Sequence, residues 1–131
     1  MADILTIATT VTVAGSPSDK FYQPITEAID VSAYKTINLQ VTGYAIKNNG
    51  GGGAPVVTVT ILTSMDNRND DGSWTPIDSA TLTVGSDFPI WAILELPQTG
   101  APLFRFIRWQ CELTTNSAGA TFSIQGLAYA T

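Results

Sequence analysis

Apolar and polar residues alternate along most of this chain, which is the pattern of half-buried β-strands. The clearest example is residues 56–64, in which Val57, Val59 and Ile61 share one face while threonines occupy the other. Pro24 interrupts an extended segment at 21–29, which favours an edge strand or a strand start there. Further strands are expected at residues 3–13, 35–44, 74–84, 88–96, 103–113 and 120–130.

This pattern predicts an all-β fold, because turn-forming residues separate the segments and no helical period occurs. We expect a single domain over residues 1–131, built as a two-sheet antiparallel sandwich of Greek-key or jelly-roll type with about eight strands. Residues 1–20 are expected to form either the first strand or an extended N-terminal arm. Residues 35–44 and 56–64 are expected to pair as a hairpin, and 88–96 is apolar enough to predict a central strand or one covered on both faces.

The composition changes this picture in one respect, which is the low content of charge. Only 13% of the 131 residues are charged, against about 25% in an average soluble domain, and eighteen are threonine. The outer faces of the strands are therefore neutral and rich in hydroxyl groups. Such a surface fits a protein that is partly covered by neighbouring subunits, and it equally fits a solvated β-sandwich.

Several functional classes are disfavoured by charge and hydropathy. The net charge is −5, and the six basic residues are scattered along the chain, so nucleic acid is not an expected partner. The first ten residues lack the basic and apolar regions of a signal peptide, and no apolar run approaches the eighteen or so residues of a membrane helix. We therefore expect synthesis in the cytoplasm and no membrane partner.

Catalytic groups are also scarce. Histidine is absent, which excludes a Ser–His–Asp or Cys–His relay. The single cysteine, Cys111, is in phase with Ile107 and Trp109 and is expected to be a buried thiol. Glu95 and Glu112 belong to different predicted strands, so nothing in the sequence pairs them for glycoside hydrolysis. We predict no enzymatic activity and no cofactor.

One acidic loop has the composition of a weak metal site. In residues 66–72, DNRNDDG, the side chains of Asn67, Asn69 and Asp71 fall on alternating positions of a calcium loop. The twelfth position is Asp78 where such a loop needs a bidentate Glu, and Pro76 lies between. A solvated turn is the preferred interpretation, because Asn, Asp and Gly are also the residues that turns select.

Aromatic residues suggest a binding surface at one strand. Trp74, Trp91 and Trp109 raise the possibility of sugar stacking, and core packing is favoured over that role for Trp74 and Trp109. If Ile107 and Trp109 point inward, Phe104 and Phe106 point outward beside Arg108, and exposed Phe with Arg is typical of a protein–protein interface. The alternative is that this strand is covered on both faces within one subunit.

The order of several segments resembles a family of small β-sandwich proteins of phage virions. The segments are DVSAYKTINLQV, VTVTILTSMDN, SWTPI, LFRFIRWQCEL and ATFSIQG, which together span most of residues 30–126. They combine an aspartate-led turn, a strand that ends in Thr-Ser before an acidic loop and a tryptophan, and an aromatic strand flanked by arginine. The residues that carry the resemblance are Asp30, Thr63, Ser64, Asp66, Trp74, Arg105 and Arg108.

The resemblance implies a head decoration or cement protein that binds the outer surface of an assembled capsid. Such proteins act as homotrimers that clamp neighbouring copies of the major capsid protein, so the implied location is the virion surface. The N-terminal segment, with Leu5 and Ile7, is then a candidate to add a strand to a neighbouring sheet. The alternative function is a carbohydrate-binding or adhesion module on a phage fibre or a cell surface.

Overall fold

The computed structural model describes residues 2–50, 53–66, 73–83, 89–97 and 102–130, and it is almost entirely β-structure. Among these residues no helix has the length and apolar character needed to span a membrane. One short 3₁₀ helix, η1, covers Ile25–Glu27. The strands are β1 (Ala2–Ala14), β2 (Lys20–Tyr22), β3 (Ile29–Asp30), β4 (Thr36–Asn48), β5 (Val56–Ser64), β6 (Thr75–Thr83), β7 (Ile90–Leu96), β8 (Phe106–Leu113) and β9 (Ser117–Tyr129).

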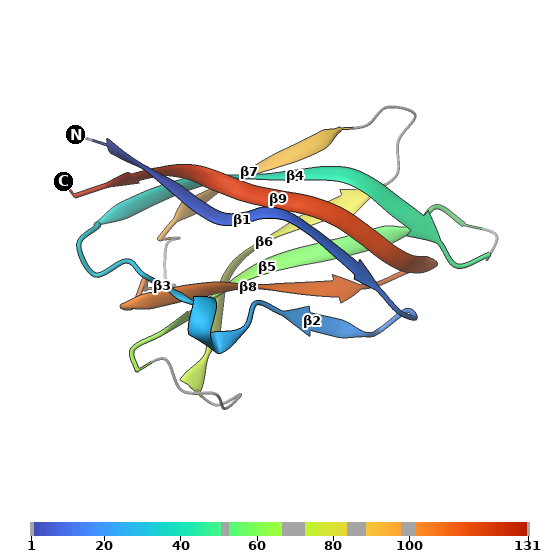
Figure 1. Cartoon of the computed structure of the whole chain (residues 1–131), viewed down its shortest axis with the longest axis horizontal. Coiled ribbons are helices and arrows are strands. Elements are labelled where there is room, and N and C mark those ends of the chain that lie inside the picture. The colour runs from blue at the N-terminus through green and yellow to red at the C-terminus, as the bar shows by residue number, and fades with distance from the viewer. Residues whose placement is uncertain (1, 51–52, 67–72, 84–88, 98–101, 131) are drawn as a thin grey trace.

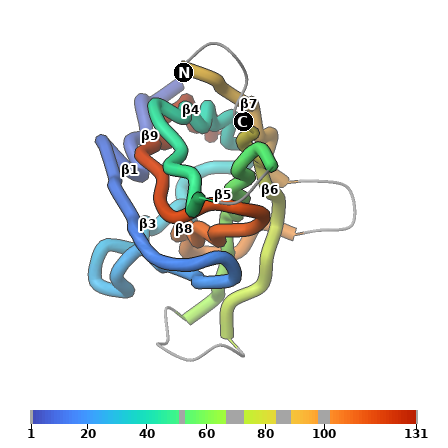
Figure 2. The backbone as a smooth tube through the Cα atoms, turned by 90° about the vertical axis from the view of Figure 1, so that its right-hand side faces the viewer, coloured from blue at the N-terminus to red at the C-terminus, as the bar shows by residue number. Residues whose placement is uncertain are grey.

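The strands form two antiparallel sheets that pack face to face, as the sequence predicts. The first sheet has the order β1-β9-β4-β7, and the second has the order β2-β8-β5-β6, with β3 also pairing with β8. If β2 and β3 are counted as one interrupted strand, this is the order of an eight-stranded jelly roll. Figure 1 shows the first sheet above the second, and Figure 2 looks along the strands at the two layers.

Strand pairing departs from the sequence-based expectation at β4 and β5. These strands do not form a hairpin: β4 pairs with β7 and β9, whereas β5 pairs with β6 and β8. The connection between β4 and β5 therefore crosses from one sheet to the other. Alternation along a strand shows which residues face the core, but it does not show which strand lies alongside, and so the hairpin prediction was wrong.

The prediction for residues 88–96 was also wrong. Strand β7 is an edge strand of the first sheet, and its side chains alternate between the core and solvent. Leu94 and Leu96 are buried, while Trp91 and Ile93 are 65% and 56% exposed. The apolar character of this segment therefore reflects an apolar outer surface and not burial on both faces.

The core lies between the two sheets and follows the predicted inward faces. Ile37, Leu39 and Val41 of β4 are fully buried, as are Val57, Val59 and Ile61 of β5. Trp109 of β8 meets Phe122 of β9 edge to face, with ring centroids 5.2 Å apart, so an aromatic pair joins the two sheets. Cys111 is also fully buried, as predicted.

The N-terminal segment is a strand of the sandwich and not a free arm. β1 pairs with β9 along most of its length, with irregular register between Thr6 and Ala8 and again between Ala8 and Val11. Ile7, Ala8 and Val13 belong to the core. Of the two expectations for residues 1–20, the structure therefore supports the strand.

Gln23 joins β1 to the second sheet where β2 and β3 leave a gap along β8. Its side-chain amide donates hydrogen bonds to the carbonyl oxygens of Ile7 (3.2 Å) and Glu27 (2.9 Å) and accepts one from the Trp109 backbone N–H (3.2 Å). Its backbone N–H donates to the Trp109 carbonyl oxygen (3.0 Å). One buried residue thereby satisfies backbone groups that neither sheet pairs at this point.

Candidate functional site

The outer face of the first sheet carries an unusual group of exposed apolar side chains. Ile4 on β1 is opposite Leu127 on β9, and the same face continues through β4 to Trp91 and Ile93 on β7. The exposed fractions are 82% for Ile4, 65% for Trp91, 56% for Ile93 and 41% for Leu127. Exposed apolar groups that gather on one face mark a candidate interaction surface.

A depression of about 460 Å³ lies across this face, and we name it the sheet-face groove. Its lining is uncharged and comes from all four strands of the sheet. The lining residues are Ile4, Asn38, Leu39, Gln40, Ile93, Gln125, Gly126 and Leu127.

Gly126 is needed at this position by the close approach of β9 to β4. A Cβ atom on residue 126 would overlap the carbonyl oxygen of Asn38 and lie 2.9 Å from the Cα atom of Leu39. Both obstacles are backbone atoms, so neither can move without distorting the sheet. Glycine at residue 126 thus allows β9 and β4 to approach closely.

A second candidate surface lies where the chain enters β8, and we name it the Phe104 end. It consists of Met65, Leu103, Phe104 and Phe106 together with the charged pair Asp30 and Arg105. Met65 is 69% exposed, while Leu103, Phe104 and Phe106 are each half-buried. A shallow pocket of about 340 Å³ lies among them, lined also by Val31, Ser32 and Tyr34.

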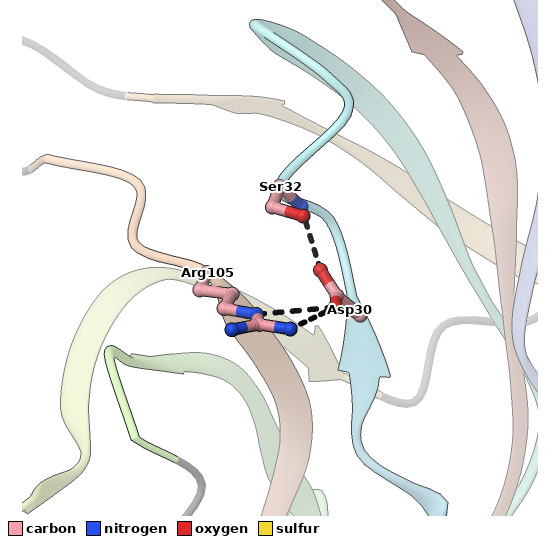
Figure 3. A network of polar contacts seen from close by, with 3 residues as sticks. All are labelled: Asp30, Ser32 and Arg105. Carbon is pink, nitrogen blue, oxygen red and sulfur yellow. Dashed lines mark hydrogen bonds and ion pairs between the residues drawn. The ribbon is translucent and has the colours of Figure 1, made fainter.

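The charged pair at the Phe104 end is held in a defined position (Figure 3). The Nε and Nη2 atoms of Arg105 both donate to Oδ2 of Asp30 at 3.1 Å, and the Ser32 backbone N–H donates to Oδ1 at 2.9 Å. Hydrogen bonds from Ser32, first from its side chain and then from its backbone, lower the pKa of Asp30, and Arg105 lowers it further. The guanidinium of Arg105 also lies 5.0 Å from the ring centroid of Phe106.

Arg108 lies inside the subunit, which agrees with the second of the two expectations for this strand, that it is covered on both faces within one subunit. Its guanidinium carbon is 5.1 Å from the ring centroid of Tyr22 and 4.7 Å from that of Trp74. Arg108 is only 6% exposed, and its Nη1 atom donates to the Gln23 carbonyl oxygen at 3.3 Å. This packing accounts for the burial of Trp74, which covers the outer face of the second sheet beside Arg108 and does not join the core cluster.

The remaining predicted site residues fall in different places. Ile7 is buried and Leu5 is partly buried against the core, so β1 uses both within its own subunit. Phe104 and Phe106 are half-buried and stay candidates for an interface. Asn67, Asn69 and Asp71 lie outside the described residues, and within those residues no group of three His, Cys, Asp or Glu side chains could hold a metal ion.

Glu95 and Glu112, considered as a possible acid–base pair, lie on opposite sheets. Glu95 is on β7 of the first sheet, and Glu112 is on β8 of the second. Both have the outward phase of their strands, so the thickness of the sandwich separates them. These two residues therefore do not form a catalytic pair.

The sheet-face groove was not predicted from the sequence, although one signal for it was present. Trp91 and Ile93 are in phase with each other and out of phase with Leu94 and Leu96, which is the spacing of two apolar faces on one strand. Such a strand is either covered on both sides or exposes one apolar face. Only the strand order decides between these outcomes, and a single sequence does not give that order.

The architecture defines the chain as a jelly-roll β-sandwich, and comparison with known proteins agrees at the level of the fold. No family model matches the sequence, and no curated protein matches it. Among solved structures, the PBSX exported protein XepA is similar with a TM-score of 0.58 at 15% identity, over 100% of this chain and 38% of XepA.

Two viral structures are similar as well. A chain of the T13 particle of infectious bursal disease virus matches with a TM-score of 0.54 at 9% identity, over 98% of this chain and 31% of the viral one. The VP2 subviral particle of that virus matches with a TM-score of 0.50, also at 9% identity, over 98% of this chain and 32% of that one. The chain thus corresponds to about a third of each of these longer proteins, and the likeness at such low identity concerns the fold.

Proposed function

We propose that this chain is a non-enzymatic structural protein of a virus particle, and specifically a decoration protein that binds the outside of an assembled head as a homotrimer. The Phe104 end carries this proposal. It combines Met, Phe and Arg side chains, which are enriched where proteins meet, with a fixed charge pair that can set the orientation of a partner. The jelly-roll fold and the low charge of the chain support the same role.

A decoration protein gains its effect from contact area and repetition. A shell offers the same site many times, so a modest surface on each subunit is occupied once the protein concentration exceeds the dissociation constant. A trimer that engages three sites together binds more tightly than one subunit, because the second and third contacts are intramolecular. Neither step needs an acid, a base or a metal.

The test uses particles purified from the virus or prophage whose genome encodes the chain. Mass spectrometry of the particles should find the protein in a fixed ratio to the major capsid protein. Analytical ultracentrifugation of the isolated protein should give three times the 13.9 kDa of the chain. Particles that lack the protein should bind it saturably when it is added back.

Variants connect that binding to the Phe104 end. Met65→Glu places a charge on an exposed side chain and should reduce particle binding more than tenfold without unfolding the domain, because Met65 is 69% exposed. Trp91→Ala is the matched control, since it removes an exposed apolar side chain from a different surface. Equal binding by Met65→Glu and the unaltered protein would remove the basis of the proposal, as would absence of the protein from purified particles.

A further inference from the structure

We propose that the sheet-face groove, together with Trp91, is a binding site for a neutral glycan chain. This surface shares no lining residue with the pocket at the Phe104 end. The inference is therefore independent of the proposed role in a virus particle.

The lack of charged residues among those that line the groove indicates a neutral ligand. All eight residues that line it are uncharged, and three of them, Asn38, Gln40 and Gln125, carry side-chain amides. An amide offers both donors and an acceptor, which is the complement of a sugar hydroxyl group. An anionic or cationic ligand would lose its hydration here and find no opposite charge among the lining residues.

The strand register places these amides in one continuous group. Gln40 is opposite Gln125 on β9 and opposite Ile93 on β7, and Asn38 is opposite Leu127. The Nε2 atom of Gln40 donates to Oγ1 of Thr42 at 3.1 Å, which fixes the orientation of that amide. Within the described part of the chain, the side-chain amides of Asn38 and Gln125 make no hydrogen bond, so their donors and acceptors are available to a ligand.

Apolar groups flank the amides at both ends. Trp91 and Ile93 lie on one side, on β7, while Ile4 and Leu127 lie on the other, on β1 and β9. The C–H face of a sugar ring packs against such surfaces, and its hydroxyl groups at the ring edge reach hydrogen-bonding partners beside them. The volume of about 460 Å³ is within the usual range for small-ligand sites.

A second copy of the chain fits this surface less well. The centre of a protein interface is its most apolar part, and the polar groups lie at its rim. Here polar groups occupy the centre, because the amides of β4 and β9 lie between Ile93 on β7 and Ile4 on β1, and the β7 margin also carries Glu95 opposite Asn38. A protein partner would bury three amides that each need hydrogen bonds, whereas a polyhydroxylated chain supplies them along its length.

Tryptophan fluorescence gives a direct assay, because the three tryptophans differ in exposure. Trp74 and Trp109 are each 6% exposed, while Trp91 is 65% exposed, so iodide quenching reports mainly on Trp91. The probes are cellohexaose, laminarihexaose, xylohexaose, mannohexaose and chitohexaose, with hexagalacturonate as the charged comparison. We expect at least one neutral hexasaccharide to protect Trp91 from iodide, with saturation at millimolar concentration or below, and hexagalacturonate to have no effect.

Variants then locate the site, with binding measured by isothermal titration calorimetry. Trp91→Ala and the double variant Gln40→Ala/Gln125→Ala should each weaken binding about tenfold or more, whereas Met65→Ala, on the other surface, should bind as the unaltered protein does. These four positions are solvent-facing, so the variants keep the fold, which circular dichroism checks.

Three outcomes would overturn the inference. The first is that none of the five neutral hexasaccharides binds. The second is that binding survives both groove variants. The third is that iodide protection of Trp91 in the unaltered protein rises with protein concentration in the absence of sugar, while ultracentrifugation shows an oligomer that Trp91→Ala converts to a monomer, which would show that a second copy of the chain covers this face.

Discussion

Replacement of Gln23 by Leu tests how the two sheets are joined beside β1. The Gln23 side chain is only 4% exposed, and leucine has a similar size. The substitution removes the three hydrogen bonds that the side chain makes with the backbone of Ile7, Glu27 and Trp109. Each bond contributes about 1 kcal/mol net, and each backbone group left buried without a partner adds to the cost. Burial of the new leucine offsets about 1 kcal/mol. We therefore expect the free energy of unfolding to fall by about 2–3 kcal/mol.

Urea unfolding followed by tryptophan fluorescence measures this loss. The slope of the transition should stay constant while its midpoint falls, because the same surface is exposed on unfolding. Gln125→Leu is the control, since that side chain is exposed and makes no hydrogen bond within the described residues, and it should change stability by less than about 0.5 kcal/mol. A loss below about 1 kcal/mol for Gln23→Leu, or equal losses for the two variants, would refute the proposed role of Gln23.

Three further predictions concern other buried or paired groups. Burial raises the pKa of the Cys111 thiol to about 12. A thiol reagent at pH 8 should therefore label Cys111 at the rate of global unfolding, and rapid labelling of the native protein would contradict this prediction. Gly126→Ala should lower the free energy of unfolding by more than about 3 kcal/mol in urea. Gly53→Ala is the control and should lower it by less than about 1 kcal/mol, because the new methyl group meets only the movable side-chain amide of Asn116. Similar losses for the two variants would contradict the close approach of β9 to β4. The pKa of Asp30 is lowered in the folded state, so its contribution is present above the unfolded pKa and is lost as the pH falls through the folded value. Asp30→Asn should therefore lower the urea midpoint at pH 7, and this effect should shrink as the pH falls through the folded value; an effect that does not change with pH would contradict the pairing.

The inward faces of the strands could be predicted from the sequence because alternation depends only on neighbouring residues. Val57, Val59 and Ile61 are buried as expected, and so are Phe122 and Ile124. Alternation does not, however, predict which strands pair with each other. The connection after β4 crosses between sheets, and alternation is identical for a strand that pairs with its neighbour and for one that crosses.

The sequence pattern also does not predict whether another segment of the chain covers the outward face of a strand. Arg108 has the outward phase that the sequence predicts, yet Tyr22 and Trp74 from distant segments cover it. Trp91 shows the opposite case. The apolar residues around it in the sequence predicted burial, whereas its place on an edge strand leaves it exposed. In both cases the outcome depends on long-range contacts that a local pattern does not contain.

The central claim is that this jelly roll acts through contact surfaces on an assembled particle. If the proposed function is right, a virus or prophage encodes the chain, and cryo-electron microscopy of its particles tests the claim most directly. We predict density for three copies of the jelly roll at symmetry-related positions outside the shell, with Met65 and Phe104 facing the major capsid protein and Trp91 facing away from it. Particles without that density, or copies attached through the sheet-face groove, would contradict the account.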